Sequence, residues 1–185
     1  CEIPKLPDGV IYTQVSAGGF HSVLLRSDGN VVICHRGGWF TIPDLPAGVT
    51  YTQVSAGFDY AALLRSDGHA VGCGPNDHGE CDVPDLPEGV TYTQASAGIG
   101  RTLLLRSDGH VVAIGDNKRG HCNIPDLPAE ATNMQVCQCN IPDAPGLTYT
   151  QVYAGKHNAP ALLLRSDGHV VTCGDGIGED QPYIP

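Results

Sequence analysis

The chain has 185 residues, a formal net charge of −10 and only 6% aromatic residues. The acidic charge makes nucleic acid an unfavourable partner, and no apolar run reaches the roughly 18–20 residues that a membrane span needs. The 24 glycines and 14 prolines favour short strands and tight turns over long helices.

A repeated unit runs along the chain. Y-T-Q-V-S-A-G begins at Tyr12, and close copies begin at Tyr51, Tyr92 and Tyr149. Each copy is followed by an apolar run that ends in R-S-D-G, by a second apolar run, and by a closing segment that ends in proline. The closing prolines are Pro4, Pro43, Pro84, Pro125, Pro142 and Pro185, so the spacings are 39, 41, 41, 17 and 43 residues. A period near forty predicts a propeller or a related β array.

The local chemistry of each unit agrees with short strands. In S-D-G the glycine adopts positive φ at low cost and the aspartate favours a turn, so the tripeptide predicts a hairpin. The run Leu103–Arg106 is almost continuously apolar, which is typical of a strand that is covered on both faces. Proline cannot donate a ladder hydrogen bond, so P-D-L-P belongs to a connection. We expect one array over 1–185, with repeats at about 5–43, 44–84, 85–125, 126–142 and 143–185.

The unit over 126–142 is truncated. Asn133–Val136 matches the start of a unit and Cys137–Pro142 matches its end, but the R-S-D-G hairpin between them is absent. The sequence allows a true deletion, or a stretch missing between Val136 and Cys137. Cys1–Pro4 and Tyr183–Pro185 share the same phase of the repeat. The array therefore either closes into a ring or is a fragment of a longer array with open edges, which are prone to association unless they are covered.

The order A-G-x-x-H, L-L-R-S-D-G-x-V-V-x-C-G and N-x-x-G-x-C-x-I-P resembles the RCC1 (regulator of chromosome condensation) repeat. The resemblance is to its short form of about forty residues, similar to HERC-like and UVR8-like proteins. It implies an all-β fold, namely an RCC1-like β-propeller with four full blades plus a truncated fifth. Such an array is incomplete or open relative to the seven blades that are typical of the family.

The four strands expected in each blade run up and down, so its loops fall on two ends of the array. The loops after the second and fourth strands, R-S-D-G and P-D-L-P, are nearly uniform, whereas the loops after the first and third strands differ between units. Loops that differ in sequence on a rigid scaffold commonly contact binding partners. Trp, Tyr and Arg dominate binding hot spots. Unconstrained drift is the alternative explanation. The predicted partner-binding residues are Arg36, Trp39, Phe40, Phe58, Tyr60, Lys118 and Arg119.

The eight cysteines recur at two positions of the repeat. A fixed disulfide framework would keep pairs together, and only one full unit has both positions, Cys73 and Cys81. We therefore expect small buried cysteines, with a Cys73–Cys81 disulfide as the alternative. Cys137 and Cys139 lack a second pair at metal-finger spacing, and Asp175–Asp180 lacks the spacing of an EF-hand loop. No metal or cofactor is expected.

The histidines and aspartates are distributed by the repeat rather than gathered at one place. His69, His110 and His169 each follow an S-D-G turn, and no P-loop, G-x-S-x-G or H-E-x-x-H motif occurs. We therefore expect no enzyme and no small-molecule substrate. The expected function is a non-catalytic protein–protein interaction module, an accessory or structural subunit of a larger assembly.

The resemblance adds two further expectations. By analogy with algal proteins alone, the assembly could be photosynthetic and the location a chloroplast, although the sequence itself indicates no compartment and no signal peptide is visible. The alternative function is an RCC1-type regulatory domain, for guanine-nucleotide exchange or for recruiting substrates to a ubiquitin ligase. The acidic charge and the missing blades count against exchange and against chromatin binding.

Overall fold

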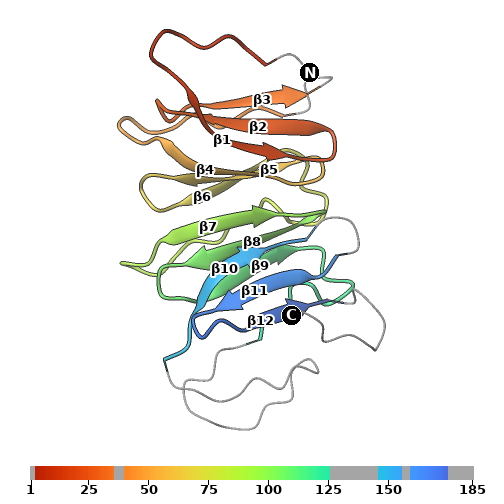
Figure 1. Ribbon diagram of the computed structural model, residues 1–185. Helices are drawn as coiled ribbons and strands as arrows, with labels where there is room; N and C mark the ends of the chain where they lie inside the picture. Colours follow the sequence, from red (N-terminus) through yellow and green to blue (C-terminus); the bar gives the residue numbers. More distant parts are fainter. Residues whose placement is uncertain (1–2, 36–39, 126–145, 156–158, 175–185) are drawn as a thin grey trace.

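The computed structural model describes residues 3–35, 40–125, 146–155 and 159–174. All regular elements in this part of the chain are β-strands. They form four antiparallel sheets of three strands each, stacked in chain order (Figure 1). The predicted all-β, open array is confirmed, whereas the truncated unit and the Val136–Cys137 junction lie outside the described residues.

Each sheet is one blade, and the blades are numbered in chain order. Blade 1 contains β1 (Tyr12–Ala17), β2 (His21–Arg26) and β3 (Val31–His35); blade 2 contains β4 (Tyr51–Ala56), β5 (Ala61–Arg65) and β6 (Ala70–Cys73); blade 3 contains β7 (Tyr92–Ala97), β8 (Arg101–Arg106) and β9 (Val111–Gly115); and blade 4 contains β10 (Tyr149–Tyr153), β11 (Ala161–Arg165) and β12 (Val170–Cys173). The middle strand of each blade pairs with both of its neighbours.

The blades have three strands where four were expected. Residues 40–43, which precede the connection to blade 2, form no strand, and the Pro43 carbonyl accepts a hydrogen bond from the Tyr51 hydroxyl at 2.8 Å. Phe40 and Ile42 of this segment pack against the core between blades 1 and 2. Residues 40–43 therefore pack on the core without joining the sheet, and Pro43 has no N–H to donate to a strand ladder.

Neighbouring blades are joined by a repeated set of hydrogen bonds. The Tyr51 N–H donates to the Gly29 carbonyl at 3.0 Å. Gln14 Oε1 accepts from the Val54 N–H at 2.8 Å, and Ser16 Oγ accepts from the Ala56 N–H at 2.9 Å. The same bonds, from Gln53 and Ser55 and then from Gln94 and Ser96, join blade 2 to blade 3 and blade 3 to blade 4. The repeated Y-T-Q-x-S segment is thus the connector between blades.

The core lies between the blades. We call the side of a blade that faces the following blade its back, and the opposite side its front. Val23 and Leu25 on the back of blade 1 pack against Val54 and Leu63 on the front of blade 2, and the next two interfaces are built alike. Each interface buries apolar side chains from both sheets, so a blade in the middle of the stack is covered on both faces.

Two glycines at the same repeat position offer a matched test of this packing. Gly68 and Gly168 both have positive φ, +82° and +87°, but a Cβ on Gly68 would overlap Thr91 of the next blade, whereas a Cβ on Gly168 would meet nothing within 4 Å. Both alanine variants carry the backbone strain of positive φ. We expect Gly68→Ala to lower the free energy of unfolding by about 1–3 kcal/mol more than Gly168→Ala does. The added methyl group at Gly68 also overpacks the contact between two blades, which we call a joint. Chemical denaturation measures both, and equal losses would contradict the description of the joint.

Candidate functional site

The stack has two chemically different ends. In blade 1, Tyr12 pairs with Arg26 at one end of the sheet and His21 pairs with His35 at the other. The R-S-D-G turns lie at the first end, which we call the turn end. The loop after the first strand and the segment after the third strand begin at the second end, the loop end. The predicted separation of uniform turns from individual loops is therefore present.

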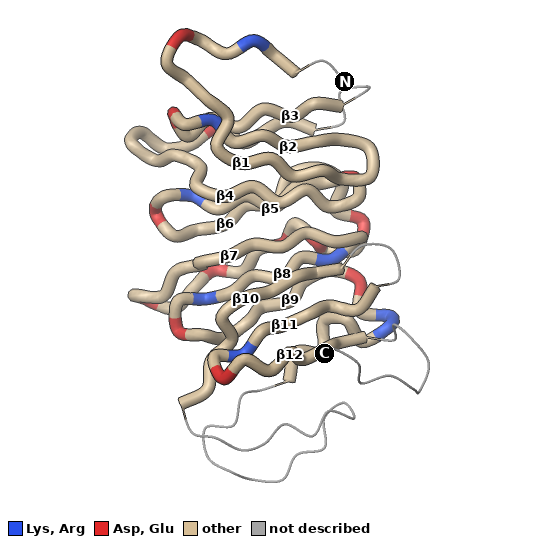
Figure 2. Tube along the Cα trace, in the orientation of Figure 1, with Lys and Arg blue, Asp and Glu red and all other residues tan. Residues whose placement is uncertain are grey.

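At the turn end the arginine and the aspartate of each R-S-D-G turn form an ion pair. Arg65 forms an ion pair with Asp67, whose other oxygen accepts from the His69 N–H at 3.3 Å, and blades 1, 3 and 4 repeat this arrangement. Desolvation acts to raise the pKa of Asp67, but the Arg65 hydrogen bond and charge hold that pKa below its ordinary value. Basic and acidic positions accordingly lie side by side down one end of the stack (Figure 2).

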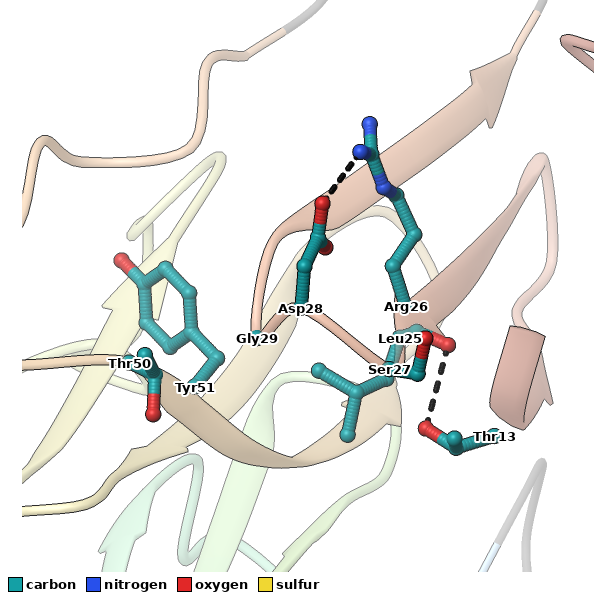
Figure 3. Close-up of a pocket in the computed structure, with 8 residues that line it drawn as sticks. All are labelled: Thr13, Leu25, Arg26, Ser27, Asp28, Gly29, Thr50 and Tyr51. Atoms are coloured by element: carbon teal, nitrogen blue, oxygen red, sulfur yellow. Dashed lines mark hydrogen bonds and ion pairs between the residues drawn. The ribbon is translucent and has the colours of Figure 1, made fainter. Parts of the chain in front are cut away.

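A shallow hollow of about 340 Å³ also lies at the turn end, between blades 1 and 2. Figure 3 shows Arg26 directed toward Asp28, and the Thr13 hydroxyl donating to the Leu25 carbonyl. Thr50 and Tyr51 of the next blade line its other side. These residue types recur at the other turns, and the charges are paired within the turn. The hollow is therefore a feature of the repeated turn structure.

At the loop end, backbone hydrogen bonds connect the loops of successive blades. The Gly19 N–H donates to the Phe58 carbonyl at 2.9 Å, and the Phe58 N–H donates to the Gly98 carbonyl at 2.9 Å. Phe20 is 65% exposed, and its ring contacts that of the half-buried Phe58 edge-on with centroids 4.8 Å apart. The loops therefore present an aromatic pair in a fixed position. Phe58 was predicted, but Phe20 was missed, although it occupies the same individual loop of blade 1.

Tyr60 was predicted to contact a partner at the surface, but the structure buries it between two blades. Its side chain is 0% exposed. Its hydroxyl oxygen lies 2.8 Å from Thr102 Oγ1, donates to the Arg101 carbonyl and accepts from the Gly98 N–H at 3.3 Å. Burial raises the pKa of Tyr60 above its ordinary range. The tyrosine satisfies polar groups of blade 3 and so connects two blades beneath the loops.

Arg101 has the equivalent role in blade 3. It is 4% exposed, and its Nε and Nη2 atoms donate to the Ala154 carbonyl at 2.7 Å and the Ala159 carbonyl at 2.6 Å in the next blade. Burial lowers the pKa of Arg101, but a guanidinium remains charged at neutral pH. Together with the buried His21 of blade 1, these residues show that the A-G-x-x-H position is structural.

The loops after β6 and β9 share one frame and differ at their tips. Asn117 Oδ1 accepts from the Cys122 N–H at 2.9 Å, and Asn117 Nδ2 donates to Asn123 at 2.8 Å. Asn76 makes the same two kinds of bond in blade 2. The exposed tips read Asp77-His78 in blade 2 and Lys118-Arg119 in blade 3. The predicted residues Lys118 and Arg119 are therefore accessible on a fixed loop.

The other predicted anchors have different positions. Phe40 is half-buried, contacts the His21 ring edge-on at 5.3 Å and packs on the core, so it contributes to packing. Arg36 and Trp39 lie outside the described residues, and their predicted roles stay predictions. A narrow hollow lined by Phe20, His21, His35, Phe40 and Asp59 opens at this end, with room for about one water molecule.

The cysteines of blade 2 are free thiols, so the alternative of a Cys73–Cys81 disulfide is not formed in the structure. Cys73 Sγ donates to the Ala61 carbonyl at 3.7 Å and Cys81 Sγ to the Pro75 carbonyl at 3.6 Å. Burial raises the pKa of each thiol to about 12, which leaves them protonated at neutral pH. Cys137, Cys139 and Asp175–Asp180 lie outside the described residues.

Among the residues that the structure describes, no three His, Cys, Asp or Glu side chains are grouped so that they could hold a metal ion. No helix in that part of the chain is long and apolar enough to cross a membrane. The Arg–Asp pairs lie in the repeated turns, and Tyr60 and Arg101 lie in separate contacts between blades.

Comparisons with known proteins agree with the repeat. The sequence profile of the regulator of chromosome condensation (RCC1) repeat matches residues 12–34, and no curated protein sequence matches the chain. Yeast RCC1 (Prp20), solved in complex with Kap60, superposes over 94% of this chain and 46% of its own, with 18% identity and a TM-score of 0.68. Prp20p from Saccharomyces cerevisiae, studied for binding to Gsp1p and histones, superposes over 93% of this chain and 47% of its own, with 21% identity and a TM-score of 0.67.

Human WBSCR16 is also similar, over 94% of this chain and 50% of its own, with 20% identity and a TM-score of 0.64. The chain spans about half the length of each of these structures. At these identities the likeness establishes the fold. The chain therefore carries an RCC1 repeat and has the fold of the RCC1-like β-propellers.

Proposed function

We propose that the chain is a non-catalytic protein-interaction module that contacts its partner with the loop end. The observation that carries this proposal is the contrast between the two ends. At the turn end each arginine is paired with an aspartate of its own turn. At the loop end, the loops after the first strands of blades 1 and 2 present an aromatic pair, and the loops after the third strands of blades 2 and 3 present Asp77 and Lys118-Arg119.

The loop end has the properties of a recognition surface. Its loops are fixed to one another by hydrogen bonds, so little ordering entropy is lost when they bind. Phe20 supplies an exposed aromatic anchor, and Arg119 and Lys118 supply charge at a distance along the stack. The narrow hollow beside Phe20 and Phe40 is too small for a drug-sized molecule. Its size favours the surface of a macromolecule as the partner.

Three variants at the two ends test the proposal. We expect Phe20→Ala and Arg119→Glu each to weaken binding to the native partner at least tenfold, because each removes or reverses an exposed anchor. Glu88→Lys is the matched charge reversal, placed in an exposed connection between blades 2 and 3, and should leave the affinity unchanged. The partner is isolated by cross-linking in native extracts and its affinity for each purified variant is measured by calorimetry. Equal weakening by all three variants, or by Glu88→Lys alone, would reject the loop end.

The second candidate is a regulatory role of the RCC1 type. Its support is the likeness to yeast Prp20, whose reported partners are Gsp1p and histones. The chain spans about half of that protein, and its net charge of −10 suits a basic partner better than an acidic one. Binding to purified Gsp1p and to histones at physiological salt separates this candidate from the first, which predicts neither.

A further inference from the structure

The joints between blades require complementary front and back surfaces, and the first and last described blades leave one of each uncovered. Every joint between the described blades contains four parts: a tyrosine N–H on a glycine carbonyl, a valine or alanine N–H on a glutamine, an alanine N–H on a serine, and apolar side chains from both sheets. The front carries the N–H donors. The back carries the glutamine and the glycine carbonyl.

The front of blade 1 is open along its first strand. Val15 is 69% exposed, whereas the residues at the same position in the following blades, Val54, Ala95 and Val152, are 2%, 3% and 4% exposed. Ile11 is 62% exposed, at the position where Thr50 covers Gly29 in the next joint. On the second strand Leu24 is buried, so the uncovered apolar strip follows β1.

The back of blade 4 is open in the matching places. Leu162 is 36% exposed, although Val23, Ala62 and Leu103 at the same position are 0%, 1% and 0% exposed. Its cross-strand neighbour Tyr153 is 48% exposed, and Val170 is 43% exposed. A side chain added at Gly168 would meet nothing within 4 Å, whereas Gly29, Gly68 and Gly109 are each covered by a threonine of the following blade.

The hydrogen-bonding groups of the two surfaces correspond as well. Gln151 and the Gly168 carbonyl occupy the acceptor positions of a joint, and the N–H groups of Val15 and Tyr12 occupy the donor positions. Among the described residues neither pair of groups has the partner that its counterparts have in the other blades. One bond of the set is lost, because Tyr153 stands where Ser16, Ser55 and Ser96 accept an N–H.

We propose that two copies of this chain associate head to tail, with the back of blade 4 in one copy packed on the front of blade 1 in the other. A second copy presents the one surface that each open face is built to receive, and two identical joints close the pair. The proposal is independent of what the loop end binds.

The mass of the purified 1–185 chain in solution is the first test. Sedimentation or light scattering should give twice 19.4 kDa at micromolar concentration and the single mass on dilution. Val15→Asp and Leu162→Asp place a charge on the front and on the back, and each should raise the dissociation constant at least a hundredfold. Ala47→Asp, in the exposed connection between blades 1 and 2, is the control and should dimerise normally.

Mixing the two variants tests the direction of association. Val15→Asp keeps an intact back and Leu162→Asp keeps an intact front, so the mixture should form a one-joint heterodimer that neither variant forms alone. Circular dichroism of each variant at a dilution where the wild type is monomeric should match the wild type, which shows that loss of association is not loss of folding. A monomer at every concentration, open-ended oligomers, or a dimer that is insensitive to both charges would overturn the proposal, whatever the outcome for loop-end variants.

Discussion

Replacing Leu103 with alanine should lower the free energy of unfolding by about 2–5 kcal/mol. Leu103 is 0% exposed on the back of blade 3 and packs in the cluster that contains Tyr149, Val152 and Leu163 of blade 4. Its loss removes apolar contacts from both sheets and leaves a cavity at the joint that holds the last blade. Urea denaturation followed by circular dichroism measures the change.

Leu162 provides the matched control because it occupies the same repeat position one blade later. At 36% exposure, Leu162→Ala should cost less than about 1 kcal/mol when the chain is dilute enough to be monomeric. At higher concentration the cost should rise toward that of Leu103→Ala, because dimerisation would bury the side chain. Equal costs in dilute solution would mean that the back of blade 4 is covered, and would contradict the open array.

Replacing Arg101 with alanine should cost about 3–6 kcal/mol, the sum expected for two charge-assisted hydrogen bonds in a buried place. The guanidinium is the donor to the Ala154 and Ala159 carbonyls, and both lose this donor in the variant. The damage should fall on blade 4, so hydrogen exchange should accelerate in β10 and β11 more than in β1 and β2.

Arg119→Ala is the control for Arg101, because Arg119 is exposed on the tip of the next loop. It should change the free energy of unfolding by less than about 0.5 kcal/mol while weakening partner binding. A stable Arg101→Ala variant with unchanged exchange in blade 4 would show that the guanidinium does not hold blades 3 and 4 together.

The repeat predicted most of the fold because it combines turn chemistry with a fixed period. The S-D-G hairpins and the apolar strands between them occur where the residues place them. The number of strands per blade was wrong for a physical reason. The segment that ends at Pro43 is apolar enough to pack on the core, but the pattern alone does not distinguish such a segment from a paired strand.

The site was predicted less well, because loop position and side-chain exposure are separate properties. Tyr60 and Lys118 both lie in individual loops at the same end, yet the tyrosine bonds to the next blade and the lysine is exposed. Only the neighbouring blade, through Thr102 and the Arg101 carbonyl, decides this. The sequence does carry a signal for Phe20, because this aromatic residue directly follows two glycines in the loop after the first strand.

Hydrogen exchange of the chain with and without its native partner tests the central claim. That claim is that the loop end contacts the partner and the turn end has a structural role. The account predicts slower exchange on binding in the loops at residues 18–20, 57–59 and 116–119, with the four R-S-D-G turns unchanged. Protection confined to the R-S-D-G turns, with the loop end unchanged, would contradict it.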